Sequence, residues 1–351
     1  MIETILAWVK SPMGQFTLFT ALKVFVAFNV MMSMVAYIVL AERRVCAFMQ
    51  DRIGPNRVGP LGLLQPAADG IKSFFKEDFT PAHVRKIYFI LAPAIALMPA
   101  ILNLAVIPFG SRLGHQPMVM ANLNVGILYT FGMVSLGVYS IVLAGYAANS
   151  KYPFLGGIRS SAQLISYEIS MGMSVIPVFL LVGSLNLNDV IVYQTGAWWH
   201  WLVFKQPLAF AIFLAAAFAE TNRTPFDLPE AEQELAGGYN IEYSSIKFAL
   251  FFMGEYANMV LASAMMVTLF FGGWTLPWFG LDQPAATLLG GVAHIVVFLA
   301  KVSVFLLLFI WVRWMWPRFR YDQLMDLGWC RFLPLALANI VLTAVILWLR
   351  S

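Results

Sequence analysis

The sequence predicts an all-α polytopic membrane protein with about eight transmembrane helices. The chain is 60% hydrophobic and only 11% charged, and its mean hydropathy is +0.77. Apolar runs of about 18 or more residues recur along it, which is the length that crosses a bilayer as a helix. A transmembrane β-barrel would instead show alternating segments of about 10 residues. We therefore expect a single membrane domain over residues 1–351, without a separate soluble domain.

Eight apolar stretches define the expected spans. They cover residues 16–40, 87–109, 122–147, 162–184, 199–219, 246–272, 288–312 and 332–349. The first stretch is too long for the core of a signal peptide and has no small-residue cleavage site, so we treat it as structure. Pro93 and Pro99 in the second span and Pro177 in the fourth are expected to free backbone carbonyls for water inside the bundle.

The distribution of lysine and arginine predicts the orientation of these spans. The loops after spans one, three, five and seven hold 16 of these residues, whereas the opposite side holds four. Membrane proteins keep positive charge on the cytoplasmic or matrix side. Both termini are therefore predicted on the outer side, and the loops at residues 41–86 and 220–245 on the inner side.

The first long inner loop, residues 41–86, is expected to combine a bent segment with an amphipathic helix. Gly54-Pro55 and Gly59-Pro60 exclude a long helix over residues 53–62. Further along, apolar residues recur every three or four positions; they are Leu64, Ala67, Ala68, Ile71, Phe74 and Phe75. This spacing predicts an amphipathic helix over about 61–78, lying in the membrane interface or against a partner. Alternatively, the basic residues of this loop only set the topology and meet lipid phosphates.

The second inner loop gathers negative charge on the side predicted to be positive. Residues 219–243 hold six of the 18 acids against one arginine, Arg223, which gives a local charge of −5. The six are Glu220, Asp227, Glu230, Glu232, Glu234 and Glu242. Asp227 and Glu230 have the spacing of a capping box, with Pro229 in the first turn, and predict a short helix that ends at Gly237-Gly238. Capping explains only two of the acids, so the others indicate a function.

Carboxylates also occur within the predicted spans. Glu168 lies roughly 9 Å inside span four and Glu255 roughly 14 Å inside span six, at 1.5 Å per residue. An ionised group near the bilayer centre costs about 2.5–3.5 kcal/mol on an insertion scale, so such groups face the bundle interior and usually serve a function. With Glu220 and Glu242 they form a ladder of acids that suits protons, although sodium is an alternative. A structural alternative is a buried ion pair between Glu255 and Lys301.

Metal and redox sites are not expected in this chain. The two cysteines, Cys46 and Cys330, are far apart in the sequence, and the four histidines are scattered. No CxxC pair, no HxxxH pair and no glycine-rich phosphate loop occurs. We therefore expect no metal, haem or iron–sulfur cluster bound by this chain.

Four segments carry a family resemblance. They read ERRVCAFMQDRIGPNRVGP, QPAADGIKSFFKED, AETNRTPFDLPEAEQELAGGYNIEY and FFMGEYANM. Together they resemble the H subunit (subunit 1 in mitochondria) of proton-pumping NADH:quinone oxidoreductase, respiratory complex I. The similarity runs from about residue 20 to the C-terminus, in matching order.

The resemblance implies a subunit at the junction of the peripheral and membrane arms, with no catalysis of its own. It implies that the chain forms much of the tunnel for ubiquinone or menaquinone, which is the substrate. The tunnel residues would be Arg43, Arg52, Asp69 and Phe226. A proton path would begin with Glu168, Glu220, Asp227, Glu230, Glu232, Glu234, Glu242, Glu255 and Tyr256.

The resemblance also implies partners and a location. The partners would be the peripheral-arm subunits at the quinone site, neighbouring small membrane subunits, and membrane lipid, with no nucleic acid. FMN and iron–sulfur clusters would belong to partner subunits. The location would be the bacterial inner membrane or the mitochondrial inner membrane.

Two other functions fit part of the sequence. A standalone cation/proton antiporter would explain the intramembrane carboxylates, but it needs neither an amphipathic surface helix nor an acidic loop that faces a partner. A structural anchor in a membrane-bound hydrogenase-type complex would explain those loops without a quinone site. Labelling by a quinone-site inhibitor, together with the identity of co-purifying subunits, separates these alternatives.

Overall fold

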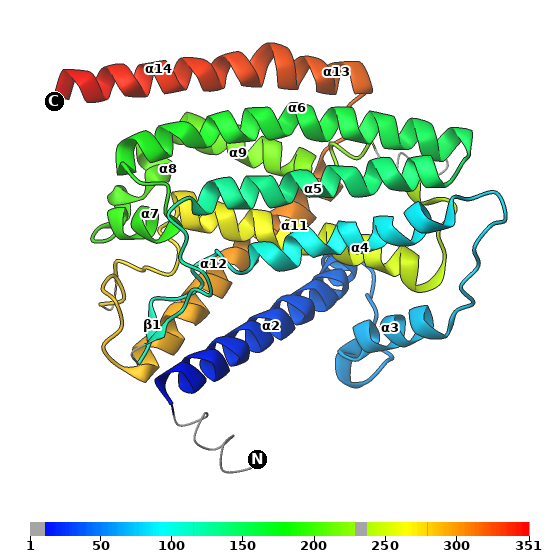
Figure 1. Ribbon diagram of the computed structural model, residues 1–351, viewed down its shortest axis with the longest axis horizontal. Helices are drawn as coiled ribbons and strands as arrows, with labels where there is room; N and C mark the ends of the chain where they lie inside the picture. Colours follow the sequence, from blue (N-terminus) through cyan, green and yellow to red (C-terminus); the bar gives the residue numbers. More distant parts are fainter. Residues whose placement is uncertain (1–10, 115, 229–236, 279, 351) are drawn as a thin grey trace.

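Long helices dominate the computed structural model, which describes residues 11–114, 116–228, 237–278 and 280–350 (Figure 1). Within this part of the chain, seven helical segments are long and apolar enough to cross a membrane. The helices are α2 (Pro12–Met49), α4 (Lys86–Asn103), α5 (Gly126–Ala147), α6 (Lys151–Val182), α11 (Ser245–Phe270), α12 (Leu288–Met315) and α14 (Leu333–Arg350). The predicted all-α polytopic fold is confirmed.

The predicted fifth span, residues 199–219, is broken into pieces. It contains the end of η2 (Trp198–His200), α8 (Leu202–Lys205) and α9 (Pro207–Glu220), and α9 alone is a shorter apolar helix. The break lies at Gln206, whose φ of −135° and ψ of 59° are not helical. Pro207 then begins α9, because proline fits the first turn of a helix. Helix α2 begins at the end of the bundle where α14 finishes (Figure 1), which is consistent with an even number of crossings if the shorter α9 is counted with the seven long helices.

The two ends of the bundle carry different short elements (Figure 1). At one end lie the antiparallel strands β1 (Arg112–Leu113) and β2 (Gln116–Pro117), together with α7 (Leu187–Tyr193). We call this the hairpin end. At the other end lie η1 (Pro60–Gly62) and α3 (Gln65–Phe75), and we call it the α3 end. The remaining elements, η3 (Gly238–Asn240), α13 (Tyr321–Asp326) and the π-helical η4 (Leu327–Phe332), connect the long helices.

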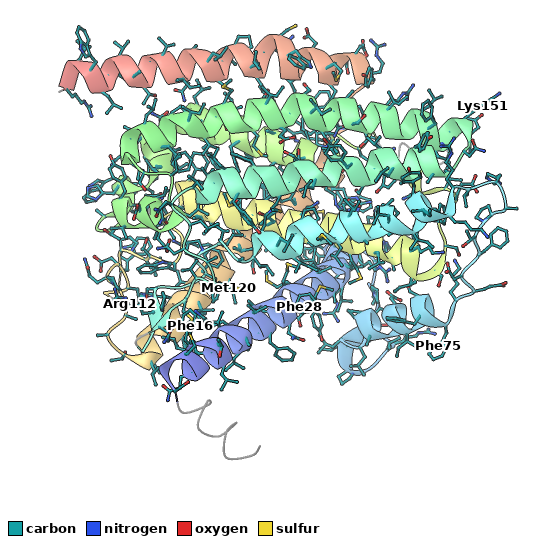
Figure 2. All side chains as sticks on the ribbon, viewed as in Figure 1. Phe16, Phe28, Phe75, Arg112, Met120 and Lys151 are labelled. Carbon is teal, nitrogen blue, oxygen red and sulfur yellow. The ribbon has the colours of Figure 1, made fainter. Side chains whose placement is uncertain are left out.

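The amphipathic helix predicted over 61–78 is present as α3, with shorter bounds. It starts later because Leu61 and Gly62 have φ values of 53° and 73°, which a helix does not accept. It ends at Phe75 because Lys76 is extended, with a ψ of 139°. Its apolar residues Phe74 and Phe75 are exposed in this chain, and Figure 2 shows Phe75 at the edge of the molecule. This face is therefore free to meet lipid or a partner.

Side-chain bonds join α3 to the start of α11. The Ser245 hydroxyl donates to the carbonyls of Ser73 at 2.9 Å and Lys76 at 2.8 Å. The Lys247 ammonium lies 2.9 Å from an Asp78 carboxylate oxygen. These contacts fix α3 beside the bundle, with its polar residues toward α2 and α11.

Close backbone packing orders the central helices. A Cβ on Gly145 of α5 would lie 2.7 Å from the carbonyl oxygen of Pro153 in α6, so only glycine permits this approach. Small residues of this kind let membrane helices pack tightly. Tyr167 of α6 is fully buried, and its hydroxyl donates to the Leu324 carbonyl of α13 at 2.9 Å. Helix α6 thus holds both α5 and the last membrane segment in place.

Candidate functional site

A large cavity opens at the α3 end, between α2, α3, α11 and α12. Its volume is about 920 Å³. Its polar lining residues are Glu42, Arg43, Arg52, Asp69, Ser73, Tyr256 and Arg313. The other walls are apolar, with residues such as Met32, Val35, Phe252 and Trp314. A cavity with apolar walls and a few converging polar groups suits a long apolar ligand with a polar head.

Arg43 and Asp69 join α2 to α3 at this cavity. The Arg43 guanidinium lies 2.7 Å from an Asp69 carboxylate oxygen, and Gln65 donates to the other oxygen at 2.8 Å. Arg52 donates from Nε to Gln50 at 2.7 Å. The sequence-predicted residues Arg43, Arg52 and Asp69 therefore line one cavity. Because the Arg43–Asp69 pair is partly exposed, it contributes little to stability, about 0–1 kcal/mol, and it remains accessible to a ligand.

A buried charge network centres on Glu42 and Arg223 and extends from the wall of this cavity into the bundle. Glu42 is 6% exposed; it accepts a hydrogen bond from the Tyr256 hydroxyl at 2.7 Å and pairs with Arg313. One Arg223 nitrogen lies 3.5 Å from Glu42, and its Nε lies 2.8 Å from Glu255. The Arg223 guanidinium also lies over the Tyr256 ring, 4.2 Å from the ring centroid. Arg223 thus bridges two carboxylates that lie on different helices.

The charge of Arg223 is fixed by its neighbours. Burial by itself lowers the pKa of Arg223, but Glu255, Tyr256 and Glu42 together raise the pKa well above the ordinary arginine value. The guanidinium therefore stays protonated in this buried position. A permanent cation in this position lets the charge on one carboxylate act on the other.

The segment that carries Arg223 is held by bonds from neighbouring helices. Gln163 of α6 donates to the carbonyls of Ala219 at 2.8 Å and Phe226 at 2.7 Å. The Thr224 hydroxyl donates to the Arg313 carbonyl of α12 at 3.3 Å. These bonds shape residues 219–226 into a compact turn after α9, and so they aim Arg223 at α2 and α11.

Two small cavities lie deeper in the bundle and share Glu220. One, of about 40 Å³, is lined by Glu220, Glu255 and Asn258 among others. The second, of about 30 Å³, is also lined by Glu220 and Asn258. Each has room for water, which needs about 10–15 Å³ of such volume and several polar partners. Oxygen Oε2 of Glu220 is buried and has no hydrogen-bond partner among the described residues, so an ordered water would satisfy it.

Glu168 continues this arrangement into α6. Its carboxylate accepts a hydrogen bond from the Ser135 hydroxyl of α5. Glu168 also lies near enough to act electrostatically on Glu220. Glu255 and Glu220 therefore share a small cavity, and Glu168 acts electrostatically on Glu220 from α6.

The remaining predicted site residues lie apart from these cavities. The Glu242 carboxylate is 3.8 Å from His83, and Asp227 is 2.8 Å from Arg318. Phe226 does not line the large cavity; it packs against Tyr167 and Phe319. Glu230, Glu232 and Glu234, with the helix predicted there, lie outside the described residues. Among the described residues, no cluster of three or more His, Cys, Asp or Glu could hold a metal ion.

Comparison with known proteins identifies the family. A family model described as NADH dehydrogenase matches residues 22–344. The chain belongs to the NADH dehydrogenase family. Similar curated members are H subunits of NADH-quinone oxidoreductase from Cytophaga hutchinsonii, 48% identical, and from Geobacter metallireducens, 50% identical; the alignments cover 94% and 93% of this chain and 96% of each relative. The NADH-quinone oxidoreductase subunit 8 of Rhodothermus marinus is 48% identical, over 93% of this chain and 96% of its own.

Within this member of the NADH dehydrogenase family, sequence reasoning missed the centre of the charge network. Glu42, Arg223 and Arg313 were not among the candidate site residues, although all three contact one another or a predicted acid. A signal was available for Glu42, because it is the first acid after the long apolar run that begins near residue 16. Nothing in the sequence paired it with arginines far along the chain.

The alternative ion pair between Glu255 and Lys301 is wrong. Glu255 pairs with Arg223 instead, in the first half of α11. The Lys301 ammonium donates to the carbonyls of Phe271 at 2.7 Å, Gly273 at 3.1 Å and Thr275 at 2.6 Å. A cation is favourable there because the carbonyl end of a helix carries partial negative charge. Glu255 therefore acts within α11, whereas Lys301 binds the segment that follows it.

Proposed function

We propose that the chain is the membrane subunit of a proton-translocating NADH:quinone oxidoreductase, respiratory complex I. In this role it forms much of the quinone tunnel and begins the proton path that links quinone reduction to pumping. The observation that carries the proposal is the Arg223 bridge, because Arg223 contacts Glu42 at the large cavity and Glu255 at the small one. Family membership and the similarity to curated H subunits of NADH-quinone oxidoreductase support it.

The large cavity is the proposed quinone tunnel. The polar head would lie near Arg43, Arg52 and Asp69, and the isoprenoid tail along the apolar walls of α2 and α11. Phe74 of α3 also lines the cavity, so the amphipathic helix would form part of the tunnel. The cavity lining gives no support for Phe226 as a contact of the quinone.

The proton path would use Glu255, Glu220 and Glu168 in sequence. Reduction of quinone consumes two protons and creates transient negative charge in the tunnel. That charge would weaken or strengthen the electrostatic interaction between Arg223 and Glu255, because Arg223 interacts with both Glu42 and Glu255. Carboxylates that interact this closely titrate together, not one at a time. A change beside Glu42 would therefore reach Glu220 and Glu168 through Arg223 and Glu255.

The acidic loop and Tyr256 would complete the path. Tyr256 donates to Glu42 and would orient that carboxylate. Asp227, Glu230, Glu232, Glu234 and Glu242 would form the mouth of the path. Gly237 and Gly238, with φ values of 112° and 67°, would let the loop change shape with charge.

The proposed setting is a respiratory membrane. The partners would be the peripheral-arm subunits at the quinone site and the neighbouring small membrane subunits. FMN and iron–sulfur clusters in those partners would deliver the electrons. Both termini would lie on the outer side of the membrane, so that the α3 end faces the peripheral arm.

The test is Glu220→Gln in the assembled complex, with Glu77→Gln as a control. Glu220 lines both small cavities, whereas Glu77 is exposed beyond α3. We expect Glu220→Gln to reduce NADH-driven proton pumping at least fivefold, and Glu77→Gln to leave it unchanged. Wild-type pumping and wild-type quinone reduction in Glu220→Gln would contradict the relay at this residue.

A quinone-site photoaffinity inhibitor tests the tunnel separately. We expect crosslinks to the segments of α2, α3 and α11 that line the large cavity, and protection by added quinone. A structural anchor without a quinone site would give no protectable crosslink. A standalone antiporter would purify without oxidoreductase subunits and would exchange ions across vesicles in response to a pH gradient.

A further inference from the structure

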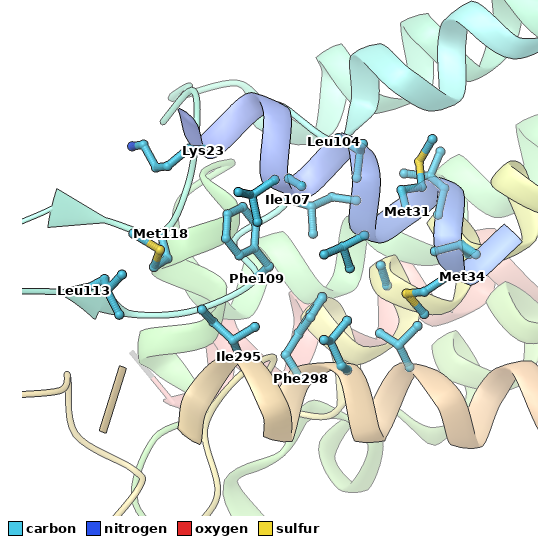
Figure 3. A pocket seen from close by; sticks show the side chains of 18 of the residues that line it. Lys23, Met31, Met34, Leu104, Ile107, Phe109, Leu113, Met118, Ile295 and Phe298 are labelled. Carbon is cyan, nitrogen blue, oxygen red and sulfur yellow. The ribbon is translucent and has the colours of Figure 1, made fainter. Parts of the chain in front are cut away.

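A second cavity lies toward the hairpin end of the bundle (Figure 3). Its volume is about 250 Å³, and its walls come from α2, α4, α11, α12 and the segment around the β1–β2 hairpin. Characteristic lining residues are Met31, Met34, Leu104, Phe109, Met118 and Phe298. Figure 3 shows side chains of α2 and α12 directed into the space between these two helices. We call this space the apolar crevice.

The apolar crevice is distinct from the proposed quinone tunnel. Helix α2 contributes Met31 and Met34 to the crevice but Met32 and Val35 to the large cavity. The two spaces share no lining residue among the described parts of the chain. The described acids of the proposed proton path do not line the crevice, so neither proposed activity uses it.

Positive charge marks one edge of the apolar crevice. Lys23 of α2 is the only charged residue among those that line it, within the described part of the chain. Its ammonium contacts the carbonyls of Pro117 at 3.2 Å and Val119 at 3.3 Å. A lysine ammonium has three donors, so one remains after these two contacts. Arg112 is exposed and comes just before the lining residue Leu113 in β1, although it does not itself line the crevice.

The crevice also opens toward the surrounding membrane. Leu22, Val26 and Val30 of α2 line it and are exposed in this chain. Exposed apolar residues on a membrane helix face lipid or a partner helix. A molecule in the membrane can therefore enter from the side, between α2 and α12, without passing through the bundle.

We propose that the apolar crevice binds an anionic phospholipid from the leaflet at the hairpin end. One acyl chain lies between α2 and α12, and the phosphate lies near Lys23 and Arg112. The apolar walls complement the chain, and the two cations complement the phosphate. The charge decides between occupants, because a neutral quinone tail or an apolar helix would leave the Lys23 ammonium at the crevice without a counter-charge. The inference does not depend on the proposed quinone tunnel.

The first test fills the crevice in the whole complex. Ala27→Phe places a ring in the crevice, whereas Ala21→Phe makes the same change on another face of α2 that does not line it. The complexes are purified in mild detergent, and their retained phospholipid is counted by native mass spectrometry. We expect Ala27→Phe to lose one anionic phospholipid per complex and Ala21→Phe to retain it. Equal lipid counts in both variants would overturn the proposal.

The second test removes the charge and keeps the hydrogen-bond donors. The double variant Lys23→Gln/Arg112→Gln is exchanged into nanodiscs that contain phosphatidylglycerol and phosphatidylcholine in equal amounts, and the lipid that survives re-extraction is identified. We expect the wild-type complex to retain phosphatidylglycerol at least threefold over phosphatidylcholine at this site, and the double variant to lose that preference. An unchanged preference, or a quinone retained in place of the phospholipid, would refute the assignment.

Discussion

Replacement of Arg223 by methionine probes the buried charge network most directly. The change removes the cation between Glu42 and Glu255, whose side chains are only 9% and 14% exposed. Removal of one partner from a buried ion pair costs about 3–5 kcal/mol, because a charge is left without compensation. Arg313 still pairs with Glu42, so we expect the lower end, about 3 kcal/mol. That value corresponds to a change of roughly 150-fold in an equilibrium constant.

A double-mutant cycle separates the electrostatic cost from lost packing. In Arg223→Met/Glu255→Gln the uncompensated carboxylate is gone, so we expect at least half of the lost stability to return. The measurement is the melting temperature and yield of the assembled complex in detergent. Arg331→Met is the control, because Arg331 makes an exposed pair with Asp326 at 3.5 Å and such pairs contribute little.

Two results would refute the reasoning about Arg223. One is an Arg223→Met complex that assembles fully and melts within about 1 °C of wild type, since a loss near 3 kcal/mol must shift a melting temperature by several degrees. The other is a double variant whose loss equals the sum of the two single losses. That result would show that Arg223 and Glu255 do not interact.

Three further predictions concern other parts of the structure. If the large cavity is the proposed quinone tunnel, Asp69→Asn should raise the apparent KM for quinone severalfold, and an unchanged KM would remove Asp69 from that tunnel. The melting temperature should stay nearly unchanged, because the pair of Asp69 with Arg43 is partly exposed. Lys301→Met should lower stability by at least about 1.5–3 kcal/mol, which is the contribution of a single hydrogen bond to a charged group. An unaltered melting temperature would count against the three bonds from Lys301 to carbonyls. Gly145→Ala should lower stability by about 1–3 kcal/mol, because the added methyl overpacks the contact between α5 and α6. Gly132→Ala is the control and should cost less, because a Cβ there would have no atom within 4 Å. Equal effects of the two substitutions in a melting assay would contradict the close approach of α5 and α6.

The fold was largely predictable because long apolar segments of the sequence mark the membrane-spanning helices directly. The long helices each contain at least 18 residues, and hydropathy alone places them. The break at Gln206 was not predictable in this way, since α8 and α9 lie within one apolar region. Pro207 is compatible with either a helix start or a tolerated proline inside a membrane helix, and only packing decides between them.

The candidate site was predictable where its residues are close in the sequence. Arg43 and Asp69 are 26 positions apart and lie on one segment that folds back on itself. The pairing of Glu42 with Arg223 and Arg313 spans 181 and 271 positions, and a single sequence carries no information on which buried acid meets which cation. The partners of Lys301 could not be predicted from the sequence either. They depend on which part of α11 or of the segment after it packs beside Lys301, and only the folded bundle determines that.

The three bonds from Lys301 also restrict how α11 can move. They attach the segment after α11, residues 271–275, to the middle of α12. At the other end of α11, Ser245 and Lys247 attach the helix to the α3 region. A piston-like slide of α11 along its axis must break bonds at both ends together. Rotation of individual side chains keeps those anchors, so Glu255 and Tyr256 can change conformation while the backbone of α11 stays in place.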